Sequence, residues 1–448
     1  MRRCAGLDIH KDTVVVCVLS ADGTRGKLMR KTFGTFRGDL IRLRVWLKQL
    51  SVTHIAMEST GVYWMAVWNI LEDPAFRLLL ANPRQLKALQ GRKSDQRDAK
   101  RIAEFLQDER LDGSYVPPAE VRQLRILTRQ RVSLLEARNE VHNQIRDLLE
   151  MTGIKLSSVA SDIMGVSGQR ILRALAAGEE SAERLSWKLR GKLRKKSAQI
   201  KEAMKAEFTE FHRNMLTLYL KHFDFLTGQV EWLEAKLTEH MAPYAQQVKL
   251  LDSIPGIDQI VAWNLLAELG PDMSVFPDAA HCASWAGLSP GTEESAGVQR
   301  SGRTKKGNRY LRRILTQAAW ANSHCKDGYL RTFFFRVKAR RGWGRAIVAV
   351  AHKLLVIAYN MLKTGEEYKE LGGDYFDRLH PERTAQRLVL RLEKMGYTFV
   401  TPPVPPVRAE QPRDVVAQQE PLQPAKPKRG RPRKIVAVEA VNSSVSIG

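Results

Sequence analysis

Short apolar and β-branched runs, separated by polar turns, fill about the first 110 residues of the chain. Residues 5–9 and 13–19 are two such runs joined by the polar "HKD", which predicts a β-hairpin. The pattern further predicts a third strand over 25–33, an amphipathic helix over 36–50, a fourth strand over 53–58, a fifth strand over 76–82 and a helix over 95–107.

Three antiparallel strands followed by helix, strand, helix and strand is the order of a ribonuclease-H-like α/β sheet. We therefore expect one α/β domain over residues 1–116. From 117 to 245 the pattern changes to long helical segments with almost no strand signal, which predicts a helical hairpin or coiled coil with a basic face available to phosphates. Helices are expected over 120–153, 186–208 and 226–241.

Residues 246–372 are expected to form a compact, mainly helical domain. Within it, residues 250–271 resemble a helix-hairpin-helix, in which a turn around Pro255 and Gly256 would present backbone N–H groups to a phosphate. Asp258 replaces the usual second glycine of that motif. A plain helical hairpin is therefore an equal alternative.

The C-terminal part divides into a helical extension over 373–400 and a tail over 401–448. The tail is rich in proline, glutamine and charge, so it is not expected to fold on its own. It contains "KPKRGRPRK", which resembles an AT-hook for the narrow minor groove of A·T-rich DNA, with Arg429, Arg431 and Arg433 as the contacting residues. An undifferentiated basic patch is the alternative.

Composition narrows the class of partner. The chain has 72 lysines and arginines against 48 acidic residues, and the resulting net charge of +24 indicates a polyanionic partner, DNA or RNA. Its four cysteines are single and far apart, which suggests a reducing cytoplasm rather than a disulfide framework or zinc site.

No membrane association is expected. The first residues are too polar for a signal peptide. The most apolar stretch, residues 346–362, is interrupted by His352 and Lys353 and is shorter than a bilayer span. It is predicted to be a buried helix of a soluble protein in a bacterial or archaeal cytoplasm.

Four acids occupy positions that would converge in a ribonuclease-H-like sheet. Asp8 ends the first strand, Glu58 ends the fourth, and Asp95 and Asp98 begin the helix at 95–107. Carboxylate oxygens suit hard divalent ions, so the set predicts a site for Mg²⁺ or Mn²⁺ that cleaves phosphodiesters. Taken alone, "SDQRDA" is also an ordinary helix start, with Ser94 as N-cap and acids favoured in the first turn.

Several motifs together resemble one known family. The stretches "GLDIHK", "ESTG.Y", "NP.......GRKSD..DA" and "GLSPGTEESAGVQRSGRTKKGNRYLRRIL" are similar to those of the DEDD-type insertion-sequence transposases of the IS110 family, over about residues 4–365. The resemblance implies a RuvC-like N-terminal domain, a coiled-coil middle and a C-terminal transposase domain with a serine nucleophile. It also implies DNA recombination, in some members guided by an element-encoded bridge RNA.

Carried over by position, the resemblance assigns the acidic tetrad to Asp8, Glu58, Asp95 and Asp98 and the nucleophile to Ser295. Ser289 and Ser301 are nearby competitors. The segment 300–313 has seven basic residues and no acid to oppose them, and it could bind the scissile phosphate. The residues proposed for this contact are Arg300, Arg303, Lys305, Lys306, Arg309 and Arg312.

Other polar residues near these motifs are not assigned to catalysis. His10 and Lys11 could orient Asp8 or contact substrate, or be solvated turn residues. Asp278, His281 and Cys282 are expected to be packing and surface positions rather than a metal site.

Three functions remain open from sequence. The main hypothesis is a recombinase acting as a homodimer or homotetramer, because strand exchange needs more than one cleavage centre. The alternative is a metal-dependent, junction-resolving endonuclease that uses water and forms no protein–DNA adduct. A non-catalytic architectural protein is the third, and the intact acid tetrad argues against it.

Overall fold

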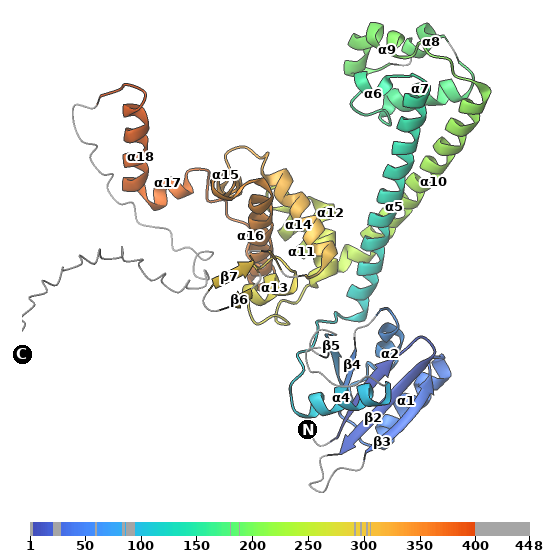
Figure 1. Cartoon of the computed structure of the whole chain (residues 1–448), viewed down its shortest axis with the longest axis vertical. Helices are drawn as coiled ribbons and strands as arrows, with labels where there is room; N and C mark the ends of the chain where they lie inside the picture. Colours follow the sequence, from blue (N-terminus) through green and yellow to red (C-terminus); the bar gives the residue numbers. More distant parts are fainter. Residues whose placement is uncertain are drawn as a thin grey trace, which may run out of the picture. The chain divides into compact units, whose positions relative to one another are not determined.

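The computed structural model describes residues 3–20, 28–58, 61–82, 86, 95–179, 181–187, 189–290, 293–295, 298–301, 303–304 and 306–398 (Figure 1). Only the backbone is described at 95–97, 182, 186–187, 191–192, 293–295 and 298–301. The chain divides into two compact units, Met1–Asp374 and Tyr375–Gly448.

A five-stranded sheet forms the N-terminal part. Its strands are β1 (Arg3–Ile9), β2 (Thr13–Ser20), β3 (Met29–Gly34), β4 (His54–Glu58) and β5 (Arg77–Ala81). They lie in the order β3-β2-β1-β4-β5. The β1–β2 and β2–β3 pairs are antiparallel, whereas β1–β4 and β4–β5 are parallel. The predicted strands and their order along the chain are confirmed.

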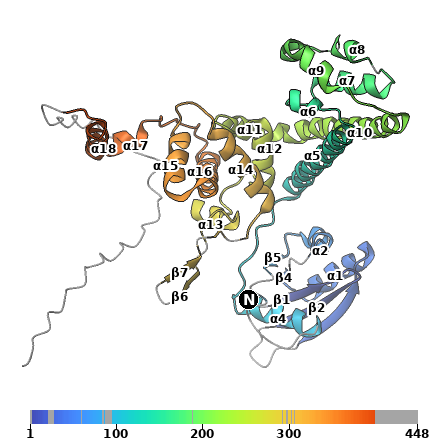
Figure 2. The same ribbon diagram turned by 45° about the horizontal axis from the view of Figure 1, so that its top comes forward.

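Helices cover both faces of this sheet (Figures 1 and 2). Side chains alternate between the two faces of a strand. On one face, Leu7 and its neighbours pack with apolar residues of α1 (Arg37–Gln49) and α2 (Trp64–Leu71). On the other, Cys4 and Ala56 pack with residues of α4 (Asp95–Gln107). Helix α4 has the bounds predicted for it.

Two long helices, α5 (Ala119–Met151) and α10 (Glu210–Met241), pack side by side (Figure 1). Between them the chain forms α6 (Leu156–Val159), α7 (Val166–Ala176), α8 (Ala182–Trp187), the 3-10 helix η1 (Gly191–Lys196) and α9 (Ser197–Ala203). The predicted helical character of this part is confirmed.

The single helix predicted over 186–208 is wrong. The structure has the end of α8, then η1, then the short α9 over these residues. Leu189 and Ile200 are both buried in the cluster formed with α5, α7 and α10. The backbone N–H of Arg190 donates to Ser167 Oγ, 2.8 Å away, instead of to a helical carbonyl. Tertiary packing therefore overrides the local helical pattern.

The following part is mainly helical. It contains η2 (Ala242–Tyr244), α11 (Ala245–Asp252), α12 (Gln259–Leu269), α13 (Ala279–Trp285), β6 (Glu293–Ser295), β7 (Val298–Ser301), α14 (Arg309–Asn322), α15 (Tyr329–Arg341) and α16 (Trp343–Thr364). Helix α16 packs against α11, α13, α14 and α15. In the described part of the chain it is the one helix long and apolar enough to cross a membrane, and 56% of its most apolar window is buried by protein. The predicted buried helix is confirmed.

The turn between α11 and α12 packs against protein. Gly256 has φ +81°, and a Cβ there would lie 3.0 Å from the carbonyl oxygen of Ala318. Asn322 Nδ2 donates to the Pro255 carbonyl at 2.6 Å. Asp258 N-caps α12 by accepting from the Val261 N–H. These contacts favour the plain helical hairpin over the phosphate-binding one.

The second unit contains α17 (Tyr375–Leu379) and α18 (Pro381–Glu393). Within it, Thr384 Oγ1 donates to Asp377 Oδ1 at 3.3 Å. In the described part of the extension expected over 373–400, the structure thus has two helices, which end at Glu393. The AT-hook-like residues Arg429, Arg431 and Arg433 lie outside the described residues.

Candidate active site

Two of the predicted acids lie level on adjacent strands. Leu7 of β1 is the partner of Met57 in the parallel β1–β4 pair, so the next residues along, Asp8 and Glu58, stand side by side. Because Cys4 and Ala56 face α4, the alternation of a strand places both acids on that same face. Asp8 is buried and Glu58 is half-buried.

Helix α4 is held against β1 through a glycine. A Cβ at Gly6 would lie 2.3 Å from the carbonyl oxygen of Ala99 and 2.4 Å from the backbone nitrogen of Ala103. Cys4 Sγ lies 3.5 Å from the Ala103 carbonyl oxygen. Cys4 therefore contacts α4 at Ala103, and Gly6 also contacts it at Ala99, so β1 and α4 run in opposite directions. Continued by two residues along β1, this direction brings the first turn of α4 toward Asp8.

The polar contacts of these acids include nearby basic residues. Asp8 Oδ2 lies 3.1 Å from His10 Nε2, which agrees with an orienting role for His10. Asp98 Oδ1 lies 3.5 Å from Arg101 Nη1 on the next turn of α4. Arg101 therefore offsets part of the charge repulsion expected between the two acids of this helix.

The acids form only part of a metal site among the described side chains. No group of three His, Cys, Asp or Glu side chains within that set is arranged to hold a metal. The set does not include the side chain of Asp95, so the full tetrad stays a prediction. Burial raises the pKa of the Cys4 thiol to about 11, and its Sγ lies 3.5 Å from the Ala103 carbonyl oxygen.

The candidate serine lies in a two-stranded hairpin. Ser295 ends β6, and its backbone partner is Val298 of β7. The competitor Ser301 lies at the other end of the hairpin, opposite Glu293. Ser289 precedes the hairpin and is half-buried. The structure thus separates the three serines along the segment, and the nucleophile assignment stays a prediction.

The base of this hairpin is fastened to the helical part. An isolated antiparallel bridge joins Pro290 to Thr304. Arg312 Nη1 donates to Thr304 Oγ1 at 2.7 Å. A Cβ at Gly307 would lie 2.3 Å from the backbone nitrogen of Gly287, so the chain returns in direct backbone contact with the loop that it left.

The basic residues of 300–313 are partly accounted for by protein contacts. Arg303, Lys306 and Arg309 are exposed, and Arg309 donates to the Tyr310 hydroxyl at 2.7 Å. The segment itself contains no acid, but Arg313 pairs with Glu136 of α5. Lys305 lies outside the described residues, and the side chain of Arg300 is not described.

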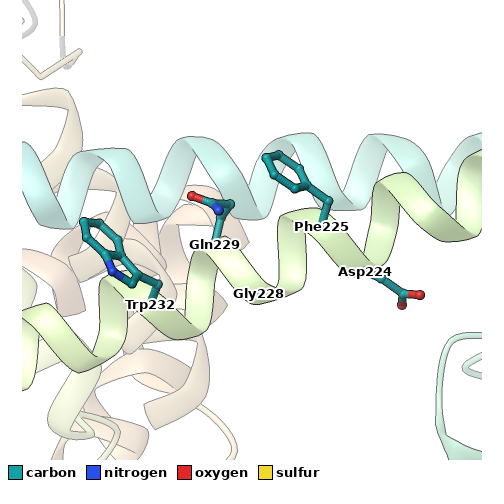
Figure 3. A pocket seen from close by; sticks show the side chains of 5 residues that line it. All are labelled: Asp224, Phe225, Gly228, Gln229 and Trp232. Carbon is teal, nitrogen blue, oxygen red and sulfur yellow. The ribbon is translucent and has the colours of Figure 1, made fainter.

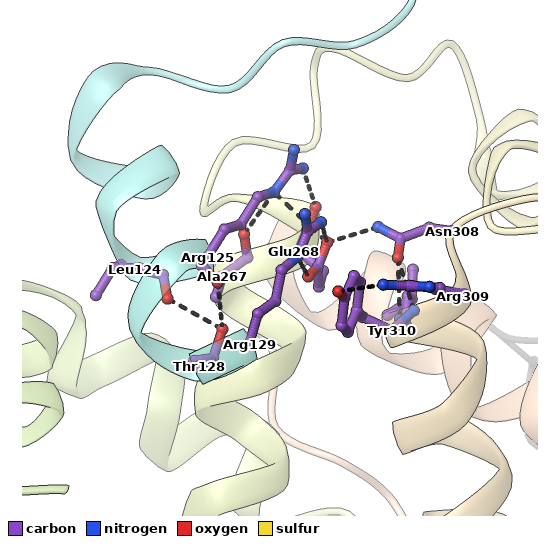
Figure 4. A network of polar contacts seen from close by, with 10 residues as sticks. Leu124, Arg125, Thr128, Arg129, Ala267, Glu268, Asn308, Arg309 and Tyr310 are labelled. Atoms are coloured by element: carbon purple, nitrogen blue, oxygen red, sulfur yellow. Dashed lines mark hydrogen bonds and ion pairs between the residues drawn. The ribbon is translucent and has the colours of Figure 1, made fainter. Parts of the chain in front are cut away.

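A buried glutamate that the sequence analysis missed joins this segment to α5 (Figure 4). Glu268 of α12 is 2% exposed. Its two carboxylate oxygens accept from Arg129 Nε and Nη2 at 2.8 Å each. Asn308 Nδ2 donates to the same carboxylate at 2.6 Å. A buried charge of this kind persists only when it is paired and hydrogen-bonded.

Asn308 also caps the next helix. Its Oδ1 accepts from the backbone N–H groups of Tyr310 and Leu311 in the first turn of α14. Arg129 stacks its guanidinium on the Tyr310 ring, 4.3 Å from the centroid. Glu268 therefore fixes the point at which the serine segment re-enters the helices. The sequence feature that indicates this role is a single acid within the apolar run "NLLAELGP".

The residues Asp278, His281 and Cys282 have structural roles. Asp278 N-caps α13 by accepting from the His281 N–H, and its carboxylate lies 2.8 Å from His281 Nδ1. Cys282 is fully buried, and burial raises the pKa of its thiol to about 12. The expectation that they are packing and surface positions is confirmed.

Comparison with known proteins identifies the family of this chain. A transposase model for the DEDD domain of IS110 elements matches residues 5–154, and a model of the IS116/IS110/IS902 transposase family matches residues 248–334. Together they cover more than half of the chain. This chain belongs to the IS110 family of transposases.

Relatives in this family extend over much of the chain. The transposase of insertion sequence IS1328 from Yersinia enterocolitica is 26% identical over 82% of this chain and 98% of its own length. The IS1111A transposase from Coxiella burnetii is 24% identical over 81% of this chain and 90% of its own length. A 43.6 kDa protein of insertion element IS110 from Streptomyces coelicolor is 35% identical, but the match spans only 30% of that protein.

The two IS110-family matches contain the two candidate sites. The first spans the sheet, α4 and all of α5, and thus Asp8, Glu58 and Asp98. The second spans Glu268 and the β6–β7 hairpin with Ser295. The tail with the AT-hook-like motif lies outside both. The family resemblance inferred from the sequence is confirmed.

Proposed function

We propose that this transposase cuts and rejoins DNA strands to mobilise an insertion sequence. The observation that supports this most is the level placement of Asp8 and Glu58 on adjacent parallel strands, with the first turn of α4 approaching Asp8. The strand order β3-β2-β1-β4-β5 supports a RuvC-like, ribonuclease-H-like domain. The net charge of +24 fits a nucleic-acid substrate.

The residues present fit a divalent metal. We propose that Asp8, Glu58, Asp95 and Asp98 hold Mg²⁺ or Mn²⁺, because carboxylate oxygens are the donors that these hard ions prefer. The bound ions would supply positive charge to neutralise a phosphodiester as it reacts. His10, 3.1 Å from Asp8 Oδ2, holds that carboxylate in place.

We further propose Ser295 as the nucleophile. Its oxygen attacks a DNA phosphorus, the bond from phosphorus to the departing strand's oxygen breaks, and that oxygen takes up a proton. The serine proton passes to a neighbouring base or to water. The phosphoserine ester keeps the energy of the broken phosphodiester, so a DNA hydroxyl reverses the step on another strand without ATP.

The proposed positive groups around Ser295 come from its own segment. We propose the exposed residues Arg303, Lys306 and Arg309 as phosphate contacts, while Arg312 also donates to Thr304. Arg300, Lys305 and the tail residues Arg429, Arg431 and Arg433 complete the proposed nucleic-acid contacts. A structured guide RNA is part of the proposal through the family resemblance.

An adduct assay tests this function. Purified protein is incubated with labelled DNA that carries the element's ends, its flanking transcript and Mg²⁺, and separated under denaturing conditions. We expect a protein–DNA adduct that is absent in Ser295→Ala and in Asp98→Asn. Ser289→Ala and Ser301→Ala are the matched controls and should keep it.

Two results would replace the proposal. Cleavage without an adduct, persisting in Ser295→Ala, would mean that water is the nucleophile and that the protein is a metal-dependent endonuclease. DNA binding without any cleavage, unchanged in Asp98→Asn and without metal, would indicate an architectural protein.

A further inference from the structure

Aromatic and basic side chains are exposed together where α15 meets α16. Trp343, the first residue of α16, is 52% exposed, and Phe335 of α15 is 42% exposed. Residues 331–345, which we call the α15–α16 corner, contain no acid and six basic residues: Arg331, Arg336, Lys338, Arg340, Arg341 and Arg345. Single exposed aromatic residues are normal on a protein surface, so it is the charge around these two that indicates a partner.

Phe335 lies between two cations on one face of α15. The Arg331 guanidinium is 5.0 Å from the centroid of the Phe335 ring, and the Lys338 ammonium is 5.5 Å from it. These residues precede and follow Phe335 by four and three positions, so all three share a helix face. The neighbouring Phe334 is buried and anchors the helix. An exposed ring flanked by cations suits a flat group that carries negative charge, such as a nucleotide.

Trp343 stands at a sharp turn with open space beside it. Gly342 alone separates α15 from α16, and its φ is +84°. A Cβ built at Gly342 or at Gly344 would meet no atom within 4 Å. The buried residues of α16 begin only at Ala346. The indole is therefore flanked by small residues and is not used to pack α16 into the protein.

The positive charge of the corner is not neutralised by neighbouring helices. Residues 328–365, which include all of α15 and α16, contain no Asp or Glu, and neither do α13 and α14, which pack against α16. The ion pairs formed within the described part of the chain include none of Arg331, Lys338, Arg340, Arg341 and Arg345. A polyanion is therefore the partner that this surface favours.

Another exposed aromatic pair has a different setting. Phe225 and Trp232 of α10 are 62% and 57% exposed, and they line a hollow together with Asp224, Gly228 and Gln229 (Figure 3). The charged residue lining this hollow is an acid. The combination of exposed rings with unpaired cations is thus a property of the α15–α16 corner and not of every exposed aromatic residue in the described chain.

We propose that the α15–α16 corner binds an unpaired strand of the DNA on which this transposase acts. Bases stack on Trp343 and Phe335, and the phosphates between them lie against the surrounding basic side chains. An unpaired strand is required, because the bases of a duplex stack on each other and do not offer their faces to a side chain. The apolar residues of α16 that follow Trp343 are buried by protein, which disfavours a membrane as the occupant.

This inference rests on the DNA substrate of the family and is independent of the serine and metal assignments. The second family match ends at residue 334, so most of the corner lies outside it. The binding tests below use EDTA, which prevents metal-dependent cutting. Failure of the adduct assay would leave their result intact, and the reverse also holds.

Fluorescence anisotropy of the full chain with a labelled single strand of mixed sequence tests the stacking. We expect Trp343→Leu and Phe335→Leu each to weaken single-strand binding by about 10-fold and to change binding of the matching duplex less than about twofold. Trp343→Phe keeps an aromatic ring and should keep most of the affinity. Trp320→Leu is the matched control, because Trp320 is 53% exposed but its ring lies 4.5 Å from that of His324. Unchanged single-strand binding, an equal loss on the duplex, or an equal effect of Trp320→Leu would overturn the proposal.

Salt dependence tests the phosphate contacts. For the double variant Arg340→Gln/Arg341→Gln, the slope of log affinity against log salt on the single strand should fall in magnitude by about 1.4, since each phosphate contact contributes roughly 0.7. An unchanged slope would show that these two side chains do not contact phosphate and would contradict the proposed path of the strand.

Photochemical cross-linking locates the site and identifies the nucleic acid. A DNA single strand that carries bromouracil should cross-link on irradiation to peptides from residues 331–345, because the halogenated base would be stacked on an aromatic ring there. Cross-links confined to other segments would overturn the proposal. Binding of RNA of the same sequence at least about 10-fold more tightly than DNA, with the same loss in Trp343→Leu, would assign the corner to RNA and overturn the choice of DNA.

Discussion

The carboxyl ends of β1 and β4, with Asp8 and Glu58, and the hairpin with Ser295 are built in different ways. The two acids follow hydrogen-bonded residues of paired strands, so the backbone ladder sets their height. Ser295 lies in a short hairpin whose base is held by the Pro290–Thr304 bridge, Gly307 and the Glu268 network. The acids are therefore positioned by the backbone ladder of the sheet, and the serine segment by loop and side-chain contacts.

Because of this difference, we expect different substitutions to disturb the two sites. A substitution under α4 should disturb the acids and leave the hairpin in place. A substitution in the Glu268 network should do the reverse, because Glu268 contacts α5 and the start of α14 rather than the sheet. Hydrogen exchange read peptide by peptide distinguishes these outcomes, since it reports the stability of each region.

Glu268→Ala is expected to have the largest effect. It leaves the buried ends of Arg125 and Arg129 without their carboxylate and removes a partner of Asn308. Burial lowers the pKa of Arg125, and the charge of Glu268 opposes that shift. We expect a loss of about 3–5 kcal/mol in local stability, measured as faster exchange in residues 286–314 and the start of α5.

Glu234→Ala is the control for this prediction. Glu234 pairs with Arg131, also on α5, but its side chain is 36% exposed. Its loss should cost about 0–1 kcal/mol. Equal effects of the two variants, or faster exchange in β1 and β4 for Glu268→Ala, would contradict the separation of the two sites.

Gly6→Ala is expected to disturb the acid site instead. The added methyl would lie 2.3 Å from the carbonyl oxygen of Ala99, so α4 must move from the sheet. We expect a loss of roughly 3 kcal/mol, seen as faster exchange in β1 and α4 with the 286–314 region unchanged. Gly38→Ala in α1 is the control, because its methyl would meet only the Arg42 guanidinium at 3.8 Å. An undisturbed α4 would show that this backbone contact does not position the acids.

Sequence reasoning worked best where local pattern decides structure. The strands and α4 follow from alternation, β-branched runs and a first turn rich in acids, and the structure has them within a few residues of the prediction. The long α5 ends at Met151, with Thr152 as its C-cap just before Gly153, as its glycine stop indicates. These features need no knowledge of distant partners.

Sequence reasoning failed where distant contacts decide structure. The role of Glu268 depends on Arg129, 139 residues earlier in the chain, and on Asn308, 40 residues later. The break in 186–208 depends on Ser167 and on burial between α5 and α10. Arg313 and Glu136, which form an ion pair, are likewise 177 residues apart in the sequence. No local pattern contains these pairings.

Two histidines give the smallest and most specific test of the comparison. Burial lowers the pKa of His352 in α16, and a hydrogen bond to the Leu288 backbone offsets part of that shift. The pKa of His54 in β4 is lowered mainly by burial and also by the nearby charge of Arg77. Each folded-state pKa is below the ordinary 6.5. Well above pH 6.5, neither histidine reduces the free energy of unfolding. As the pH falls through 6.5, each histidine increasingly reduces it, and the reduction levels off below the folded-state pKa.

His352→Gln should flatten the acid loss of stability in the 286–314 region, because His352 contacts the backbone just before the serine segment. His54→Gln should flatten it in the sheet and leave that region unchanged. Exchange of the same peptides measured at pH 7.5 and pH 5, after correction for the intrinsic rate, would show this. If either variant reduced the acid loss of stability equally in both regions, the sheet and the serine segment would respond to acid as one unit. Their stabilities would then not be independent.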